Sequence, residues 1–101
     1  MTEHDIRQSL VDQLRQQGKE TAYTLDLVER YMWHWKASQD LQKDVEKRGV
    51  KVSSFNTKGF EVVKDNESLE AIRKEHIEML KILQTLKLQE PVKLSGDNDY
   101  L

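Results

Sequence analysis

The feature that most constrains the fold is an uninterrupted segment, residues 19–48, that contains neither glycine nor proline. Gly18 and Gly49 bound this segment, and Thr21 and Thr24 are both suitable N-cap residues near its start. Apolar residues recur along it at helical spacing: one face holds Leu25, Val28, Tyr31, Met32 and Trp35, and Leu41 and Val45 continue it with an angular drift. The pattern predicts a helix that ends at Arg48 and is about 40 Å long, which is long for 101 residues.

Two further helices are predicted on either side of this long helix. The first runs from the N-cap Thr2 to Gln17, and its apolar stripe is narrow: Ile6, Leu10, Val11 and Leu14. The last runs from the N-cap Asn66 to about Leu88 and is closed by Pro91. Its apolar seam alternates by three and four residues and comprises Leu69, Ile72, His76, Met79, Leu83 and Leu86.

Three more apolar residues, Ile77, Leu80 and Ile82, flank this seam and widen the apolar arc of the last helix to roughly 220°. A single antiparallel helix covers a narrower arc than this. The last helix is therefore expected either to be the buried centre of the fold or to contact both its own chain and another copy.

Between the second and third helices the apolar spacing changes. Val52 and Phe55 precede the turn-like sequence "NTKG", and Phe60 and Val62 follow it. Gly59 can supply the positive φ that a three-residue hairpin loop requires. The segment predicts either a short β-hairpin or an ordered loop, and it is mildly basic through Lys51, Lys58 and Lys64.

The fold class expected from these elements is mainly α: three helices, one of them long and central, with the hairpin or loop between the second and third. Residues 1–92 form a single helical domain that oligomerises, because so small a chain buries little apolar surface alone. Residues 93–101 form a flexible acidic tail with too little apolar content to fold by itself.

The charge balance limits the classes of partner. Sixteen basic and eighteen acidic residues give a net charge of −2, which provides no global field for nucleic acid, so such binding would need local patches or their repetition in an oligomer. The chain has no cysteine, which excludes disulfides and thiolate sites. It has no signal-like start and no apolar run near 18 residues, so a soluble, intracellular protein is expected.

Two tryptophans flank a histidine in the sequence "VERYMWHWKAS" of the long helix. Successive helical residues differ by about 100°, so Trp33 and Trp35 cannot both face one core. Trp35 shares the inward face, which leaves Trp33 outside it. Two interpretations stay open for Trp33: a subunit contact, or cover from the first helix or from the loop after Gly49 of the same chain.

No catalytic, cofactor-binding or metal-binding group is predicted. His4, His34 and His76 lie far apart, and none has a second ligand three or four residues away. No glycine-rich phosphate loop, serine elbow or supported pair of carboxylates is present; Glu75 and Glu78 fit a solvated helix face. The chain is therefore not expected to be an enzyme or to need a cofactor.

The order of several segments resembles a known family. Five segments occur in this order: a helix with "RYMWHWKAS", then "EKRG", a hairpin-like "KVSSFNTKGFEVVKDN", a helix "AIRKEHIEMLKILQTLKL" and an acidic end "GDNDYL". In this order they resemble the small-subunit terminase proteins of tailed bacteriophages. The resemblance covers residues 31–101 and is greatest to a short class with Asn-Pro, Met-Leu-x-Ile-Leu-x-x-Leu-Gly-Leu and a late acidic tail. The matching residues are Tyr31, Trp35, Gly49, Gly59, Asn66, Met79, Leu80, Ile82, Leu83, Leu86 and Leu88. Glu67 replaces the proline of that pattern, Lys87 replaces the glycine between its last two leucines, and Pro91 falls one place later than in the pattern.

The resemblance implies a non-enzymatic DNA-packaging factor in the cytoplasm of the bacterial host. Several copies would assemble into a ring, recognise or load viral double-stranded DNA, and present it to the large subunit, which carries the ATPase and nuclease. No membrane partner is implied.

Three groups of residues are candidates for these contacts. The DNA candidates are Lys43, Lys47, Arg48, Lys51 and Lys58, with Arg7, Arg15 and Lys19 as a second set; the alternative is that these side chains only solubilise a charged helix. The oligomer candidates are Trp33, Ile72, Ile77, Met79, Leu80, Ile82, Leu83 and Leu86. The large-subunit candidates are Asp97, Asp99, Tyr100 and Leu101, for which an ordinary disordered terminus is the alternative.

Two rival functions stay open. The first is a small helical adaptor or scaffold that binds only protein through the same surfaces. The second, a compact transcriptional regulator, is weaker because no third helix with base-reading residues follows closely behind Gly18.

Overall fold

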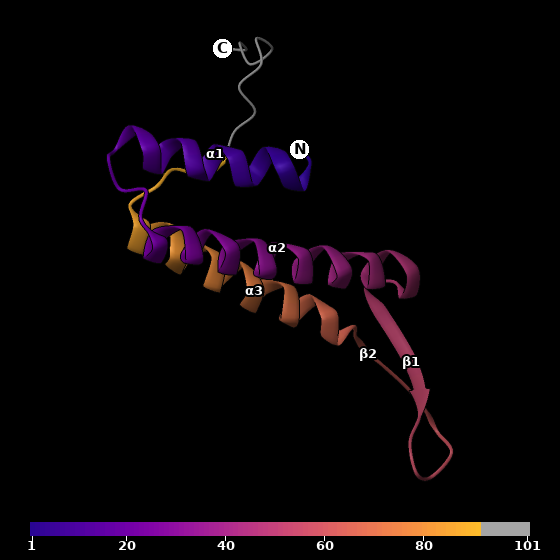
Figure 1. The fold of residues 1–101 in the computed structure, drawn as a ribbon. Coiled ribbons are helices and arrows are strands. Elements are labelled where there is room, and N and C mark those ends of the chain that lie inside the picture. Colours follow the sequence, from indigo (N-terminus) through magenta and orange to yellow (C-terminus); the bar gives the residue numbers. More distant parts are fainter. Residues whose placement is uncertain (92–101) are drawn as a thin grey trace, which may run out of the picture.

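The computed structural model of the chain describes residues 1–91. Its elements, in order, are α1 (Glu3–Gln16), α2 (Ala22–Arg48), β1 (Lys51–Phe55), β2 (Glu61–Asp65) and α3 (Glu67–Leu86). Helices α2 and α3 lie side by side, α1 lies against α2 at the end far from the hairpin, and the hairpin points away from the helices (Figure 1). The mainly α prediction is confirmed, and the segment between α2 and α3 is a β-hairpin rather than an irregular loop.

The first two helices begin with reciprocal hydrogen bonds between their N-cap and the third helical residue. The Thr2 Oγ1 accepts from the Asp5 amide at 3.1 Å, and the Asp5 carboxylate accepts from the Thr2 amide at 3.0 Å. Thr21 and Thr24 exchange the same pair of bonds, at 3.2 and 2.9 Å. The sequence offered both threonines as N-cap candidates. In the structure Thr21 is the N-cap, and Thr24 is the third helical residue of the same capping box.

Helices α1 and α3 end in the same way but with different residues. After α1, Gly18 has φ +67°, and the Lys19 and Gly18 amides donate to the carbonyls of Leu14 and Arg15. After α3, Lys87 has φ +57°, and the Leu88 and Lys87 amides donate to the carbonyls of Leu83 and Gln84. Both ends are Schellman motifs, whose left-handed position favours glycine. Lys87 therefore occupies a position where a side chain is strained.

Replacing Lys87 by glycine is expected to raise the free energy of unfolding by about 0.5–1 kcal/mol, because relief of the left-handed strain exceeds the extra entropy of an unfolded glycine. Urea unfolding measures this change. Gly18→Lys is the matched reverse substitution: a Cβ at Gly18 meets no atom within 4 Å, so backbone strain alone should lower stability. A Lys87→Gly variant no more stable than the original chain would contradict this account.

One hydrophobic core is shared by the three helices and the residues after α3. The buried apolar side chains are Ile6, Leu10, Leu14, Val28, Tyr31, Met32, Leu83, Leu86 and Leu88. Trp35 packs against this core, as predicted from its place on the inward face of α2. The core lies toward the α1 end of the molecule, where all three helices meet.

The apolar arc of α3 is covered more fully by its own chain than the sequence predicted. Leu83 and Leu86, two oligomer candidates, are only 5% and 4% exposed, because they share the core with buried residues of α1 and α2. Met79 and Ile82 are half-buried against the same core. Ile77 and Leu80 stay exposed, and Ile72 is intermediate. His76, predicted within the seam, is exposed instead.

The hairpin pairs β1 and β2 antiparallel, from Lys51 opposite Asp65 to Phe55 opposite Glu61. Its loop is closed by the Gly59 amide, which donates to the Asn56 carbonyl at 3.0 Å, and Gly59 has φ +83°. The Asn56 side chain accepts from the Lys58 and Phe60 amides. The three-residue loop with a left-handed glycine is confirmed.

Candidate interaction surfaces

Trp33 lies on the side of α2 that faces away from the core, and its side chain is 65% exposed. Neither α1 nor the hairpin covers it, so the interpretation that the same chain buries Trp33 is wrong for the described residues. The physical reason is the direction of the hairpin, which leaves the helices instead of folding back along α2 (Figure 1).

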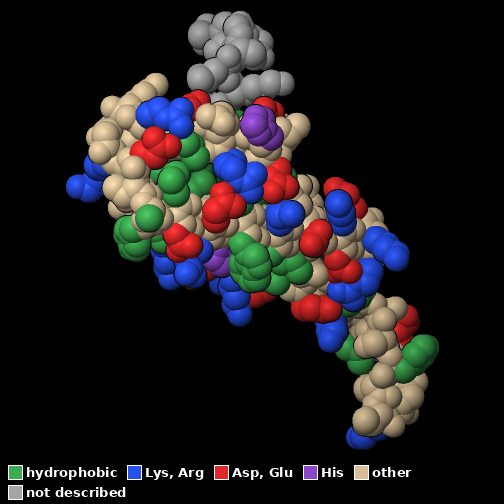
Figure 2. All heavy atoms as spheres, viewed as in Figure 1, with side chains coloured by type: hydrophobic (Ala, Val, Ile, Leu, Met, Phe, Trp, Pro, Cys, Tyr) green, Lys and Arg blue, Asp and Glu red, His purple; other side chains and the backbone are tan. Residues whose placement is uncertain are grey.

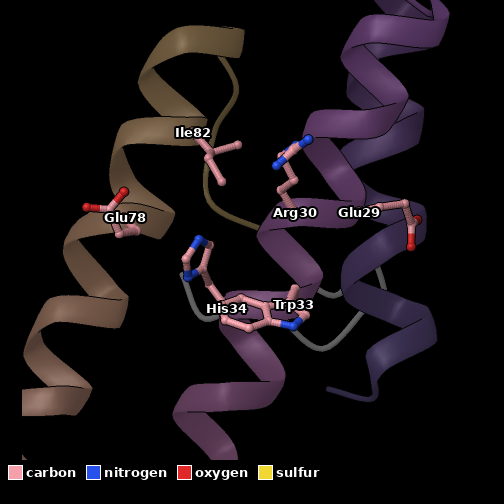
Figure 3. A pocket seen from close by; sticks show the side chains of 6 residues that line it. All are labelled: Glu29, Arg30, Trp33, His34, Glu78 and Ile82. Atoms are coloured by element: carbon pink, nitrogen blue, oxygen red, sulfur yellow. The ribbon is translucent and has the colours of Figure 1, made fainter.

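A groove of about 680 Å³ lies beside Trp33, between α2 and α3. Its lining residues are Glu29, Arg30, Trp33, His34, Glu78 and Ile82. Figure 3 shows Ile82 and Glu78 on the α3 wall and Arg30, Trp33 and His34 on the α2 wall, with Glu29 turned to the other side of α2. Glu29 accepts there from Arg7 of α1 at 2.8 Å. The groove therefore offers two apolar side chains edged by charge.

His34 and Glu75 join the two walls beneath this groove. The His34 Nδ1 lies 3.0 and 3.1 Å from the two carboxylate oxygens of Glu75, and both side chains are largely buried. The His34 ring also meets the Trp33 indole edge to face, with centroids 5.1 Å apart. No sequence pattern predicts this pair, because its members are 41 residues apart. Its effect is to hold the indole at a fixed place on the α2 wall.

Further large apolar side chains are exposed on α3 and on the hairpin, apart from Met1, Tyr23 and Val50 elsewhere. On α3 they are Ile77 and Leu80, and on the hairpin they are Phe55, Phe60, Val62 and Val63. The hairpin set was missed as an interaction surface, although one signal was readable: adjacent valines at 62 and 63 point to opposite faces of a strand, so both faces are apolar. Figure 2 shows hydrophobic side chains gathered on the helices and again on the hairpin.

The base of the hairpin is held by a polar network around Arg48. Its guanidinium donates to Asp44 at 2.7 Å, to Glu67 at 2.8 Å and to the side chain of Asn66 at 3.0 Å. Asn66 is buried, caps α3 through the Ser68 amide and donates to the Gly49 carbonyl. The hairpin is thus fixed at the point where α2 ends and α3 begins.

The same network predicts an acid dependence of stability. Hydrogen bonds from Arg48 and then Ser68 hold the pKa of Asp44 well below its ordinary 3.8. A carboxyl whose pKa falls on folding stabilises the fold above its unfolded pKa, and this contribution is lost as the pH falls from about 3.8 toward the folded value. Compared with Asp44→Asn by urea unfolding, the original chain should be clearly more stable at pH 7, and the gap should close below pH ~3.8.

Asp40→Asn is the matched control for this prediction, because Asp40 lies one turn earlier on α2 and has no ion pair among the described residues. That variant should show no such pH-dependent gap. A gap for Asp44→Asn that stays constant down to pH ~2.5 would contradict the linkage.

The predicted DNA candidates divide into two groups. Four have acidic partners: Arg7 pairs with Glu29 and Glu3, Arg15 with Glu20 and Asp12, Arg48 with Asp44 and Glu67, and Lys51 with Asp65. The other four, Lys19, Lys43, Lys47 and Lys58, form no ion pair within residues 1–91. Lys43 and Lys47 lie one turn apart on α2, whereas Lys58 is in the hairpin loop and Lys19 in the α1–α2 connection. Basic and acidic side chains are interspersed over the face in Figure 2.

The large-subunit candidates Asp97, Asp99, Tyr100 and Leu101 lie outside the described residues. Among the residues that are described, no group of three His, Asp or Glu side chains is placed to hold a metal ion. In that same part of the chain, no helix is long and apolar enough to cross a membrane. Compared with known proteins, the chain matches no family model, no curated protein and no solved structure.

Proposed function

We propose that this chain is the non-catalytic small subunit of a phage DNA-packaging terminase, which works as an oligomer that loads viral double-stranded DNA for a large ATPase and nuclease subunit. The proposal combines the order of sequence segments described above with one structural observation: large apolar side chains stay exposed on the groove, on α3 and on the hairpin. A small chain that leaves Trp33 and both faces of a hairpin uncovered favours association with other copies.

Phosphate contacts in this proposal fall to the lysines without acidic partners. Lys43 and Lys47 form one row on α2, so a single copy offers only a weak site. In an assembly the row repeats at each subunit, and simultaneous contacts along one DNA raise the affinity without any new type of contact. Binding should therefore depend on the number of copies and fall steeply with salt.

The experiment is a pair of measurements on the purified chain: the mass of the native assembly and retention on double-stranded DNA at several salt concentrations. A multimer whose DNA affinity falls with salt is expected. Lys43→Ala with Lys47→Ala should weaken binding and lower the salt slope by roughly 2 per subunit in contact. Lys64→Ala with Lys74→Ala removes the same charge from two other lysines that form no ion pair within residues 1–91, and it should leave the slope unchanged. A multimer with no DNA binding at low salt would overturn the DNA role.

A protein-only adaptor is the second candidate, and one observation favours it. Half of the predicted DNA candidates are engaged by carboxylates of their own chain, which leaves little free positive charge. In that case the apolar surfaces would serve protein partners alone, and the salt series above would show no retention on DNA.

A further inference from the structure

The hairpin carries more apolar surface than its own chain covers. Nine of its ten strand residues are exposed, and Phe55 is 75% exposed. Figure 1 shows both strands leaving the helices. A lone two-stranded hairpin is marginally stable in water unless a further element packs on it. This hairpin therefore needs a partner surface.

The register places a specific set of side chains on one face of the hairpin. Phe55 lies directly opposite Glu61, and Val63 lies diagonal to Phe55 on the same face. Phe55 and Val63 are the most exposed apolar residues of their strands. Glu61 forms no ion pair within residues 1–91, which leaves an available negative charge beside the exposed ring.

The groove between α2 and α3 offers apolar walls and one basic edge, since its two glutamates, Glu29 and Glu78, are paired with Arg7 and Lys81. Its apolar part is formed by the exposed indole of Trp33 and by Ile82 on the opposite wall (Figure 3). Arg30 lies at its edge and, within residues 1–91, is paired only with Asp26, one turn earlier on the same helix, with both side chains more than half exposed. Such exposed pairs contribute little, so Arg30 can bind an incoming carboxylate at small cost.

The hairpin cannot reach the groove of its own chain. Trp33 lies 15 residues before Arg48 on α2, which is about 22 Å along the helix. The hairpin starts after Arg48, is fixed there by Asn66 and extends in the opposite direction (Figure 1). A hairpin that occupies this groove must therefore come from another copy.

We propose that the hairpin face formed by Phe55, Glu61 and Val63 docks in the Trp33 groove of a second copy, with Glu61 paired to Arg30. Two different surfaces of one chain then meet, so the contact is heterologous. Repeating it from copy to copy builds an oligomer, which is a closed ring when the rotation between copies closes. This inference rests on the oligomer of the proposed function, and it names the contact that builds that oligomer.

A charge exchange tests the contact. Arg30→Glu and Glu61→Arg should each raise the concentration at which half of the chains assemble by roughly tenfold, because each places like charges together. The double variant should return it to within about threefold of the original. Lys64→Glu is the matched control, because Lys64 lies on the opposite face of the same strand, and it should leave assembly unchanged. Additive losses in the double variant would overturn the pairing.

Cross-linking gives a second readout, which the absence of natural cysteine makes selective. One sample carries Val63→Cys and another carries Glu78→Cys, and the two are mixed and treated with a short thiol-specific cross-linker. Products joining the two variants are expected. If assembly persists and Val63→Cys links only to itself, the hairpins pair with one another and the proposed docking is wrong.

These outcomes separate this inference from the proposed function. A multimer that binds DNA but lacks the cross-link between positions 63 and 78 overturns the docking and keeps the packaging role. A multimer that has the cross-link but does not bind DNA keeps the docking and overturns the packaging role. A monomer at high concentration overturns both.

Discussion

Replacing Leu10 by alanine is expected to lower the free energy of unfolding by about 3 kcal/mol. Leu10 is completely buried in the middle of α1, where it packs with Leu14 and with the buried residues of α2 and α3. The loss combines the transfer of the missing methyl and methylene groups with the cavity left behind. A chain of this size has a total stability of about 5–10 kcal/mol, so the loss is a large part of it. Urea unfolding followed by circular dichroism measures the change.

Leu80→Ala is the matched control, because it removes the same atoms from a side chain that is 47% exposed. It should cost less than about 1 kcal/mol in the unfolding of the single chain. Equal destabilisation by Leu10→Ala and Leu80→Ala would show that Leu10 does not belong to the buried core.

Replacing Trp33 by alanine is expected to weaken assembly by about 2 kcal/mol or more per contact, because an exposed tryptophan in an apolar groove is a typical anchor of an interface. The unfolding free energy of the dissociated chain should change little, since the indole packs mainly against the His34 ring. Sedimentation over a range of concentrations measures the first effect, and urea unfolding of dilute protein measures the second.

Trp35→Ala is the comparison for Trp33, because Trp35 is two residues away and packs against the core. It should destabilise the single chain as well as any assembly. Persistence of the full assembly in Trp33→Ala, together with a large loss of stability of the dissociated chain, would show that the indole serves its own fold instead.

Local sequence signals were enough to predict the elements of this fold. Thr2, Thr21 and Asn66 were readable as caps, because their partners lie within three residues along the chain. Gly59 was readable as a left-handed loop residue for the same reason. The place of Trp33 outside the core followed from helical geometry alone. Each of these predictions depends on short-range contacts.

Long-range contacts could not be predicted in this way. The burial of Leu83 and Leu86 depends on a core that they share with residues of α1 and α2, which periodicity within α3 does not reveal. The His34 and Glu75 pair and the network around Arg48 likewise join residues from different helices. The apolar arc of α3 was visible in the sequence, but which part of it is buried depends on how α3 packs with the other helices.

The short segment after α3 also determines when α1 can complete its packing during synthesis. Gln13 of α1 donates to the Gln89 carbonyl at 3.0 Å and accepts from the Gln89 amide at 2.7 Å, while Leu88 is buried beside the α1 leucines. Helix α1 is thus held by hydrogen bonds to residues that are synthesised more than seventy positions after it. Before these residues are made, Leu10 and Leu14 of a nascent chain can be covered by α2 but not by Leu88, and a premature stop before Leu88 would leave this side of α1 more accessible to proteases.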